Sequence, residues 1–209
     1  MPIEDEEKFV IIPRTGQYDP THARLTEIGS SMLISQFYVD GVRIRSVLFE
    51  ATGDQQCLFT WKKSLPNGSL MEIETEISME DRDLLLPLSN KAIRKRRNPI
   101  LRTDIASWDM DEFMDDHDRP WLIMVEAEGG QCPTSNEVAR AVQNLNLLSG
   151  NYSVVMIEKS DRRFDNARLA VEDGRWEALS FIRDYHQSIY DMTVSSQDHH
   201  ESSFTHTPG

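Results

Sequence analysis

The stretch MEIETEI, residues 71–77, alternates acidic side chains with mostly apolar ones. Successive side chains of a β-strand point to opposite faces, so residues two apart share a face. The stretch therefore predicts a strand with Glu72, Glu74 and Glu76 on one face and Met71, Ile73 and Ile77 on the other. Such a strand predicts a sheet whose apolar face is buried and whose other face carries three clustered carboxylates.

The same period-two placement of charge recurs in both directions from this stretch. Strands are expected near residues 3–12, 32–38, 41–50, 56–63, 70–77, 92–100, 105–113 and 121–128. On their charged faces these strands carry Glu4, Glu6 and Lys8; Arg43 and Arg45; Thr60 and Lys62; Glu72, Glu74 and Glu76; Lys95 and Arg97; Asp109 and Asp111; and Glu126 and Glu128.

One such strand is typical of an ordinary half-exposed sheet, with its charges in water. Seven of them, often of one sign within a strand, favour a closed antiparallel β-barrel with a polar lumen. The fold class expected is α+β, with helices packed on the apolar outside of the barrel. In the strand that contains Arg94 to Arg97, Lys95 and Arg97 are expected to face inward, with Arg94 and Arg96 outward.

Two helices are expected between and after the strands. Ser78 suits the N-cap of a short helix that Pro87 limits. A second helix should follow Pro133, with Ser135 or Asn136 as its cap.

A third helical stretch is expected from Phe164 to Ile189, with a break at Asp173-Gly174. Residues 195–209 are rich in Ser, His and Thr and predict a disordered tail. Residues 1–194 are therefore expected to form a single domain that includes the C-terminal helices.

Composition excludes several classes of function. The chain has 35 acidic and 22 basic residues among 209, a net charge of −13, which repels phosphate backbones and argues against a nucleic-acid partner. No apolar run approaches the roughly 18 residues of a membrane span, so no membrane association is expected. Two cysteines cannot form a disulfide framework, which favours a cytoplasmic location.

The charges of the predicted lumen indicate which ligand it binds. Clustered carboxylates suit Mg²⁺ or Mn²⁺, and clustered Arg and Lys suit phosphate oxygens. The nine carboxylates outnumber the six bases by three. We therefore expect a polyphosphate that binds well only together with its metal.

At this point the chain resembles the CYTH proteins, or triphosphate tunnel metalloenzymes, over about residues 3–170. The matching stretches, in the family's own order, are Glu4-Asp5-Glu6-Glu7-Lys8-Phe9, Arg43-Ile44-Arg45, Thr60-Trp61-Lys62, Glu74-Thr75-Glu76-Ile77, Lys95-Arg96-Arg97, Asp109-Met110-Asp111-Glu112-Phe113, Glu126-Ala127-Glu128 and Arg163-Phe164-Asp165-Asn166. Two departures are Glu72, where many members have arginine, and Asp109, which replaces a glutamate.

The resemblance implies an eight-stranded antiparallel tunnel that hydrolyses a triphosphate with Mg²⁺ or Mn²⁺. Its metal ligands would be Glu4, Glu6, Glu74, Glu76, Asp109, Asp111, Glu126 and Glu128. Its phosphate ligands would be Lys8, Arg43, Arg45, Lys62, Lys95, Arg97, Arg162 and Arg163.

Lys8 is also the residue expected to position or deprotonate water. The partner is a small molecule with a triphosphate group, either inorganic triphosphate or a nucleoside triphosphate. Two alternatives stay open: an adenylyl cyclase of the same family and a polyphosphate- or nucleotide-binding module without turnover. A homodimer also stays open.

Overall fold

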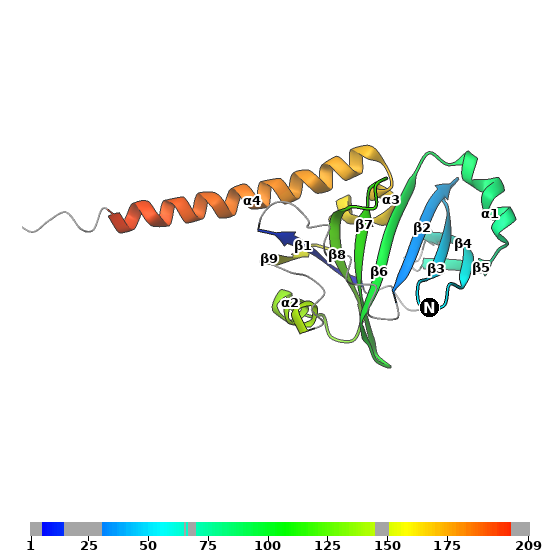
Figure 1. Ribbon diagram of the computed structural model, residues 1–209, viewed down its shortest axis with the longest axis horizontal. Coiled ribbons are helices and arrows are strands. Elements are labelled where there is room, and N and C mark those ends of the chain that lie inside the picture. The colour runs from blue at the N-terminus through cyan, green and yellow to red at the C-terminus, as the bar shows by residue number, and fades with distance from the viewer. Residues whose placement is uncertain (1–5, 15–30, 65, 67–69, 145–150, 202–209) are drawn as a thin grey trace, which may run out of the picture.

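The computed structural model describes residues 6–14, 31–64, 66, 70–144 and 151–201, and its main element is one antiparallel sheet (Figure 1). The nine strands are β1 (Glu6–Pro13), β2 (Met32–Val39), β3 (Val42–Phe49), β4 (Gln55–Ser64), β5 (Leu70–Glu76), β6 (Ala92–Arg102), β7 (Ala106–Met114), β8 (Pro120–Gly129) and β9 (Tyr152–Ile157). All eight strands predicted from the sequence are present, each within a few residues of its expected ends.

The sheet order is β5-β4-β3-β2-β6-β7-β8-β1-β9, so β5 and β9 are its edges. Within the described residues these two edges do not pair with each other, and the sheet is open. The expectation of eight strands is therefore corrected to nine, and closure into a barrel is not confirmed. The ninth strand lies in the segment where the sequence predicted only a helix, and it pairs antiparallel with β1.

The register places the charged side chains on one face of the sheet. Lys8 lies opposite Glu126, and Glu6 lies opposite Glu128. On the other half of the sheet, Thr60 lies opposite both Arg43 and Glu74. The inward and outward assignment in β6 is also confirmed, because Arg94 pairs with exposed Asp118 while Arg96 pairs with Glu50.

Helices α1 (Met79–Leu85) and α2 (Ser135–Asn144) cover the face opposite the charges. Ser78 caps α1 as predicted, because its hydroxyl accepts from the backbone N–H of Asp81. The cap of α2 is different: Thr134 and Glu137 form a reciprocal capping box, since each accepts a hydrogen bond from the other's backbone N–H. Val138 and Val142 of α2 are fully buried in a cluster with outer-face strand residues such as Phe9.

The C-terminal helices lie on the charged face, which corrects the expectation that all helices pack outside. They are η3 (Arg162–Phe164), α3 (Asn166–Leu169) and α4 (Glu172–Glu201). Phe164 and Leu169 share a buried cluster with Val10, Phe113 and Met124, strand residues on the same face as Lys8 and Glu126. One end of that face is therefore a hydrophobic core, and the charges occupy the remainder.

The helical break comes at Ala170–Val171, three residues before the predicted position, and Gly174 lies inside α4. A Cβ on Gly174 would lie 1.9 Å from the carbonyl oxygen of Arg168, so the close approach of α3 and α4 requires glycine there. Helix α4 projects far from the sheet (Figure 1) and continues to Glu201, through part of the predicted tail; residues 202–209 lie outside the described part. None of the described helices has the length and apolarity to cross a membrane.

Candidate functional site: an ionic cavity on the charged face

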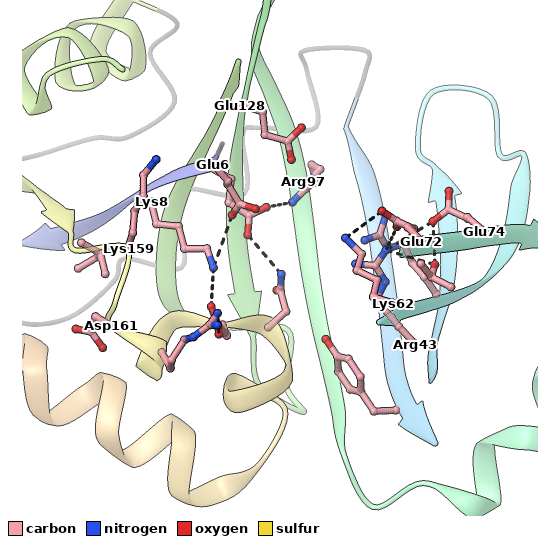
Figure 2. Close-up of a pocket in the computed structure, with 18 of the residues that line it drawn as sticks. Glu6, Lys8, Arg43, Lys62, Glu72, Glu74, Arg97, Glu128, Lys159 and Asp161 are labelled. Atoms are coloured by element: carbon pink, nitrogen blue, oxygen red, sulfur yellow. Dashed lines mark hydrogen bonds and ion pairs between the residues drawn. The ribbon is translucent and has the colours of Figure 1, made fainter. Parts of the chain in front are cut away.

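A cavity of about 660 Å³ opens on the charged face of the sheet. One wall comes from β1, β8 and the segment that follows β9, and the facing wall comes from β3, β4 and β5 (Figure 2). Its lining residues are Glu6, Lys8, Tyr38, Gly41, Arg43, Arg45, Thr60, Lys62, Glu72, Glu74, Arg97, Glu126, Glu128, Ile157, Glu158, Lys159, Asp161, Arg162, Asp165 and Asn166.

The structure brings most of the predicted site residues together in this cavity. They are Glu6, Lys8, Arg43, Arg45, Lys62, Glu74, Arg97, Glu126, Glu128 and Arg162. The described lining carries seven Lys or Arg side chains and eight Asp or Glu side chains, so its charge is almost balanced. Both signs of charge thus face one cavity, as the alternation of charges predicted, although that cavity lies on an open sheet.

On the β3–β5 wall, cations and carboxylates already form pairs. Arg43 donates to the hydroxyl of Thr60 at 3.3 Å, and that hydroxyl donates to Glu74 at 2.8 Å. The Nζ atom of Lys62 lies 3.3 Å from a carboxylate oxygen of Glu72. Glu72, the residue that departs from the family pattern, therefore partly neutralises a predicted phosphate ligand.

Arg45 differs from its neighbours on this wall. The Nε atoms of Arg43 and Arg45 are both buried without a hydrogen-bond partner, but Arg43 pairs with Glu72 and Glu74, whereas Arg45 makes no ion pair with the described residues. Burial lowers the pKa of Arg45, and the positive charges of Arg43 and Arg97 lower it further. The carboxylates of Glu74 and Glu126 act in the opposite direction but do not outweigh these effects, so nearby carboxylates compensate the guanidinium only in part.

The opposite wall gathers carboxylates around Lys8. Burial raises the pKa of Glu6 to about 7, and the neighbouring charges of Glu126 and Glu128 add to that effect. The Oε1 atom of Glu6 has no hydrogen-bond partner, and its nearest cation is the Nζ atom of Lys8 at 3.7 Å. Burial by itself lowers the pKa of Lys8, but the charges of Glu6 and Asp165 outweigh it, and the net shift is upward.

A buried ionic network lies beneath this wall. Arg97 makes two hydrogen bonds to Asp111, at 2.6 and 2.7 Å, and a further one to Glu126. Lys95 is 1% exposed and donates to Asp111 and to Asn166. Burial raises the pKa of Asp111, but Lys95 and Arg97 outweigh it and hold that pKa well below its usual range.

Two predicted ligands, Lys95 and Asp111, therefore support the cavity from below and do not line it. Their side chains reach one another because α3 covers this end of the charged face and excludes water from it. Burial lowers the pKa of Lys95 despite the nearby charge of Asp111.

Four further predicted residues do not line the cavity as described. Asp109 pairs with Arg102 and lies 3.4 Å from Arg97. Arg163 pairs with Asp161 and stacks on the ring of Phe181 at 4.9 Å. Glu76 is exposed near the end of β5, and Glu4 lies outside the described residues.

Several lining residues were not among the predicted ligands. Asp165 and Asn166 lie in the motif Arg163-Phe164-Asp165-Asn166, which gave a signal for this segment but no role for these two side chains. Thr60 shares the charged face of its strand with Lys62, so the same alternation could have included it. Lys159 and Asp161 follow β9, and no pattern in the sequence marks them.

The donor chemistry of the carboxylate wall suits a hard divalent cation, because Glu6, Glu126 and Glu128 offer only oxygen ligands. The unpartnered Oε1 atom of Glu6 is an available acceptor there. Within the described residues, however, no group of three or more His, Cys, Asp or Glu side chains has metal-binding geometry. The described residues thus supply oxygen donors suited to a divalent cation, but they do not form a complete coordination shell by themselves.

Comparison with known proteins gives similarity to solved structures alone: no family model and no curated protein matches the chain. The structure is similar to the inorganic triphosphatase NE1496, with 18% identity, a TM-score of 0.42, and coverage of 81% of this chain and 95% of that one. It is also similar to a protein of Pyrococcus horikoshii, PH1819, with 16% identity, a TM-score of 0.37, and coverage of 71% and 93%. A third neighbour is the putative adenylyl cyclase HpAC1 from Hippeastrum, described as having a dominant triphosphatase activity, with 14% identity, a TM-score of 0.34, and coverage of 69% and 86%.

Proposed function

We propose that this protein binds the triphosphate group of a small molecule in the ionic cavity and hydrolyses it with the help of Mg²⁺ or Mn²⁺. The observation that carries the proposal is Arg45, a half-buried cation with a buried, unpartnered Nε atom beside two other arginines. A bound anion would give Arg45 the direct ion pair that it lacks among the described residues. A phosphate group fits best, because its oxygens match the fork of donors on a guanidinium.

A chain of phosphates suits the cavity better than a single phosphate does. Cations occur on both walls, with Arg43, Arg45 and Lys62 on one and Lys8 and Arg97 on the other. A ligand that contacts both groups at once must carry several negative charges along its length. Inorganic triphosphate and the triphosphate group of a nucleotide both meet that requirement.

The carboxylates of Glu6, Glu126 and Glu128 would hold the divalent cation together with phosphate oxygens of the ligand. Mg²⁺ is commonly bound by one or two carboxylates, water and substrate phosphates, so an incomplete protein cage is compatible with this role. When bound, the metal would neutralise charge on the transferred phosphoryl group and orient water.

Lys8 would act as a fixed positive charge at the reacting phosphate. Its pKa is raised by Glu6 and Asp165 against the opposing effect of burial, so it keeps its proton near neutral pH and is poorly suited to remove one from water. In the hydrolysis, the water oxygen bonds to the terminal phosphorus as the bond to the bridging oxygen breaks. Orthophosphate forms, and the leaving group is pyrophosphate from inorganic triphosphate or the nucleoside diphosphate from a nucleoside triphosphate. The proton from water passes to solvent or to the phosphate products.

The deciding experiment incubates the full chain with inorganic triphosphate and with ATP, in Mg²⁺ and in Mn²⁺ separately, and measures every product. Orthophosphate release supports hydrolysis. Cyclic AMP together with pyrophosphate would instead indicate the cyclase alternative. Tight binding without any product would indicate the binding module.

Arg45→Gln is the informative variant, and Arg94→Gln is its control. Arg94 lies on the opposite face of the sheet, where it pairs with exposed Asp118, so its loss removes the same charge without touching the cavity. We expect Arg45→Gln to lose triphosphate binding and turnover and Arg94→Gln to keep both. Equal activity in the two variants would contradict the assignment of the cavity as the phosphate site.

A further inference from the structure

The carboxylate of Asp165 lies at the cavity between two cations that would otherwise face a ligand. Lys8 donates to its Oδ1 atom at 2.9 Å, and Arg162 donates to its Oδ2 atom at 3.0 Å. Both carboxylate oxygens are therefore used, one by each cation. The Asp165 side chain is 32% exposed, so it is accessible from the cavity and is not locked in the core.

The position of Asp165 in the chain makes this arrangement informative. It is the N-cap residue of α3, where an aspartate usually accepts from a backbone N–H of the helix that it precedes. Here its side chain makes no such cap. Its neighbour Phe164 is fully buried and holds the segment against the sheet. The Asp165 carboxylate therefore reaches Lys8 and does not accept from a backbone N–H of α3.

Asp165 thus occupies the place of an anion. A phosphate oxygen that approached Lys8 and Arg162 would need the same donors, and it would be repelled by the carboxylate already there. A phosphate that arrives with a divalent cation has a different effect, because the cation attracts Asp165 as well as the phosphate.

From this competition we propose that Asp165 is a specificity residue, which makes the cavity select phosphate chains that carry a divalent cation over the free polyanion. The inference rests on the proposed function, since it concerns binding at the same site. It assigns the discrimination to one side chain, where the sequence suggested only a general excess of acidic charge.

The test measures the affinity of the full chain for inorganic triphosphate by titration calorimetry, once with EDTA and once with Mg²⁺. The variant is Asp165→Asn, which keeps the shape and removes the charge. The control is Asp161→Asn, which makes the same charge change at the same rim. The Asp161 carboxylate pairs with Arg163, which does not line the cavity, and it accepts from the backbone N–H of Arg163, a hydrogen bond that the Asn oxygen can also accept.

We expect Asp165→Asn to tighten metal-free binding about tenfold, the order of magnitude for the loss of two partly exposed ion pairs. The ratio of the affinities with and without Mg²⁺ should shrink accordingly. Asp161→Asn should change metal-free affinity by less than about threefold, because its effect is only long-range and screened.

Each other outcome overturns a specific statement. If the wild-type chain binds triphosphate but Asp165→Asn binds it no more tightly without metal, the inference is wrong and the proposed function stands. Equal tightening in both variants also refutes it, since general electrostatics would then explain the effect. Failure of the wild-type chain to bind triphosphate in either condition would refute the proposed function, and this inference with it.

Discussion

Replacement of Arg45 by methionine should make the protein more stable and unable to bind its ligand. Arg45→Met keeps a long, flexible side chain of similar reach and removes the charge. The charge of Arg45 has no direct ion-pair partner among the described residues, and the repulsion by Arg43 and Arg97 is only partly offset by Glu74 and Glu126. The charge of Arg45 is therefore expected to lower the stability of the fold, and under the proposed function a bound anion would offset that effect.

We scale the effect from replacements of buried ion pairs by apolar side chains, which are often neutral or stabilise proteins by about 1–4 kcal/mol. Arg45 is only partly accessible to water, so we take about 2 kcal/mol. In a domain of this length each kcal/mol raises the melting temperature by roughly 2–4 °C, which gives an increase of about 4–8 °C. Triphosphate at one hundred times its Kd should stabilise the wild-type chain by about 2.7 kcal/mol and the variant by nothing.

Thermal unfolding followed by circular dichroism, with and without inorganic triphosphate and Mg²⁺, measures both effects. Arg96→Met is a contrasting variant on the adjacent strand pair, because Arg96 pairs with Glu50 and lies 3.9 Å from buried Glu112. At pH 8, where Glu112 is largely ionised, its loss should destabilise the fold by about 2 kcal/mol, since it leaves Glu112 and Glu50 without their cation. A lower melting temperature for Arg45→Met, or a ligand-induced shift as large as that of the wild type, would refute the reasoning.

Three further predictions concern the groups that support the site. Burial raises the pKa of Glu112 from 4.5 to about 7, so the folded chain holds a proton that the unfolded chain releases, and stability is lost as the pH rises through this window. Urea unfolding at pH 5 and pH 8 should show a loss for the wild type that Glu112→Gln reduces by about 3 kcal/mol; identical pH dependence would contradict the assignment. Asp111→Ala should cost about 3–5 kcal/mol of unfolding free energy because it leaves Lys95 buried beside Arg97, and a loss below about 1 kcal/mol would show that the network is dispensable. Thr134→Ala removes one half of the capping box of α2 and should lower stability by about 1 kcal/mol, with ligand affinity unchanged as the control.

The eight strands were predictable because their charged and apolar residues alternate. This alternation follows from one physical constraint, namely that successive side chains of a strand point to opposite faces of the sheet. Strand β9 was not, because Tyr152–Ile157 has no alternating charge and reads as a short apolar run that could equally be part of a helix. Its pairing with β1 is a long-range contact that no local pattern encodes.

The position of helices α3 and α4 on the charged face could not be predicted from the sequence, for a related reason. Val10, Leu122 and Met124 alternate correctly with the charged positions of their strands, but the pattern does not say that α3 and α4 cover them. This cover explains why Lys95 and Asp111, which lie on the charged face, became a buried pair. The alternation gives the face of a residue, and the neighbouring elements decide whether that face meets water, ligand or another helix.

The contrast between Arg97 and Arg45 connects the fold to the proposed function. Both are arginines on the same face, but Arg97 is fully engaged by Asp111 and Glu126, and its pKa is raised by them against the effect of burial. A group so firmly paired is held in place and can orient a ligand, but it gains little from one. Arg45 has no such pairing among the described residues, so under the proposed function an incoming anion would gain more from Arg45 than from Arg97. The fixed network under one wall and the unpaired cation on the other are thus complementary: the first sets the geometry of the cavity, and the second supplies the driving force to fill it.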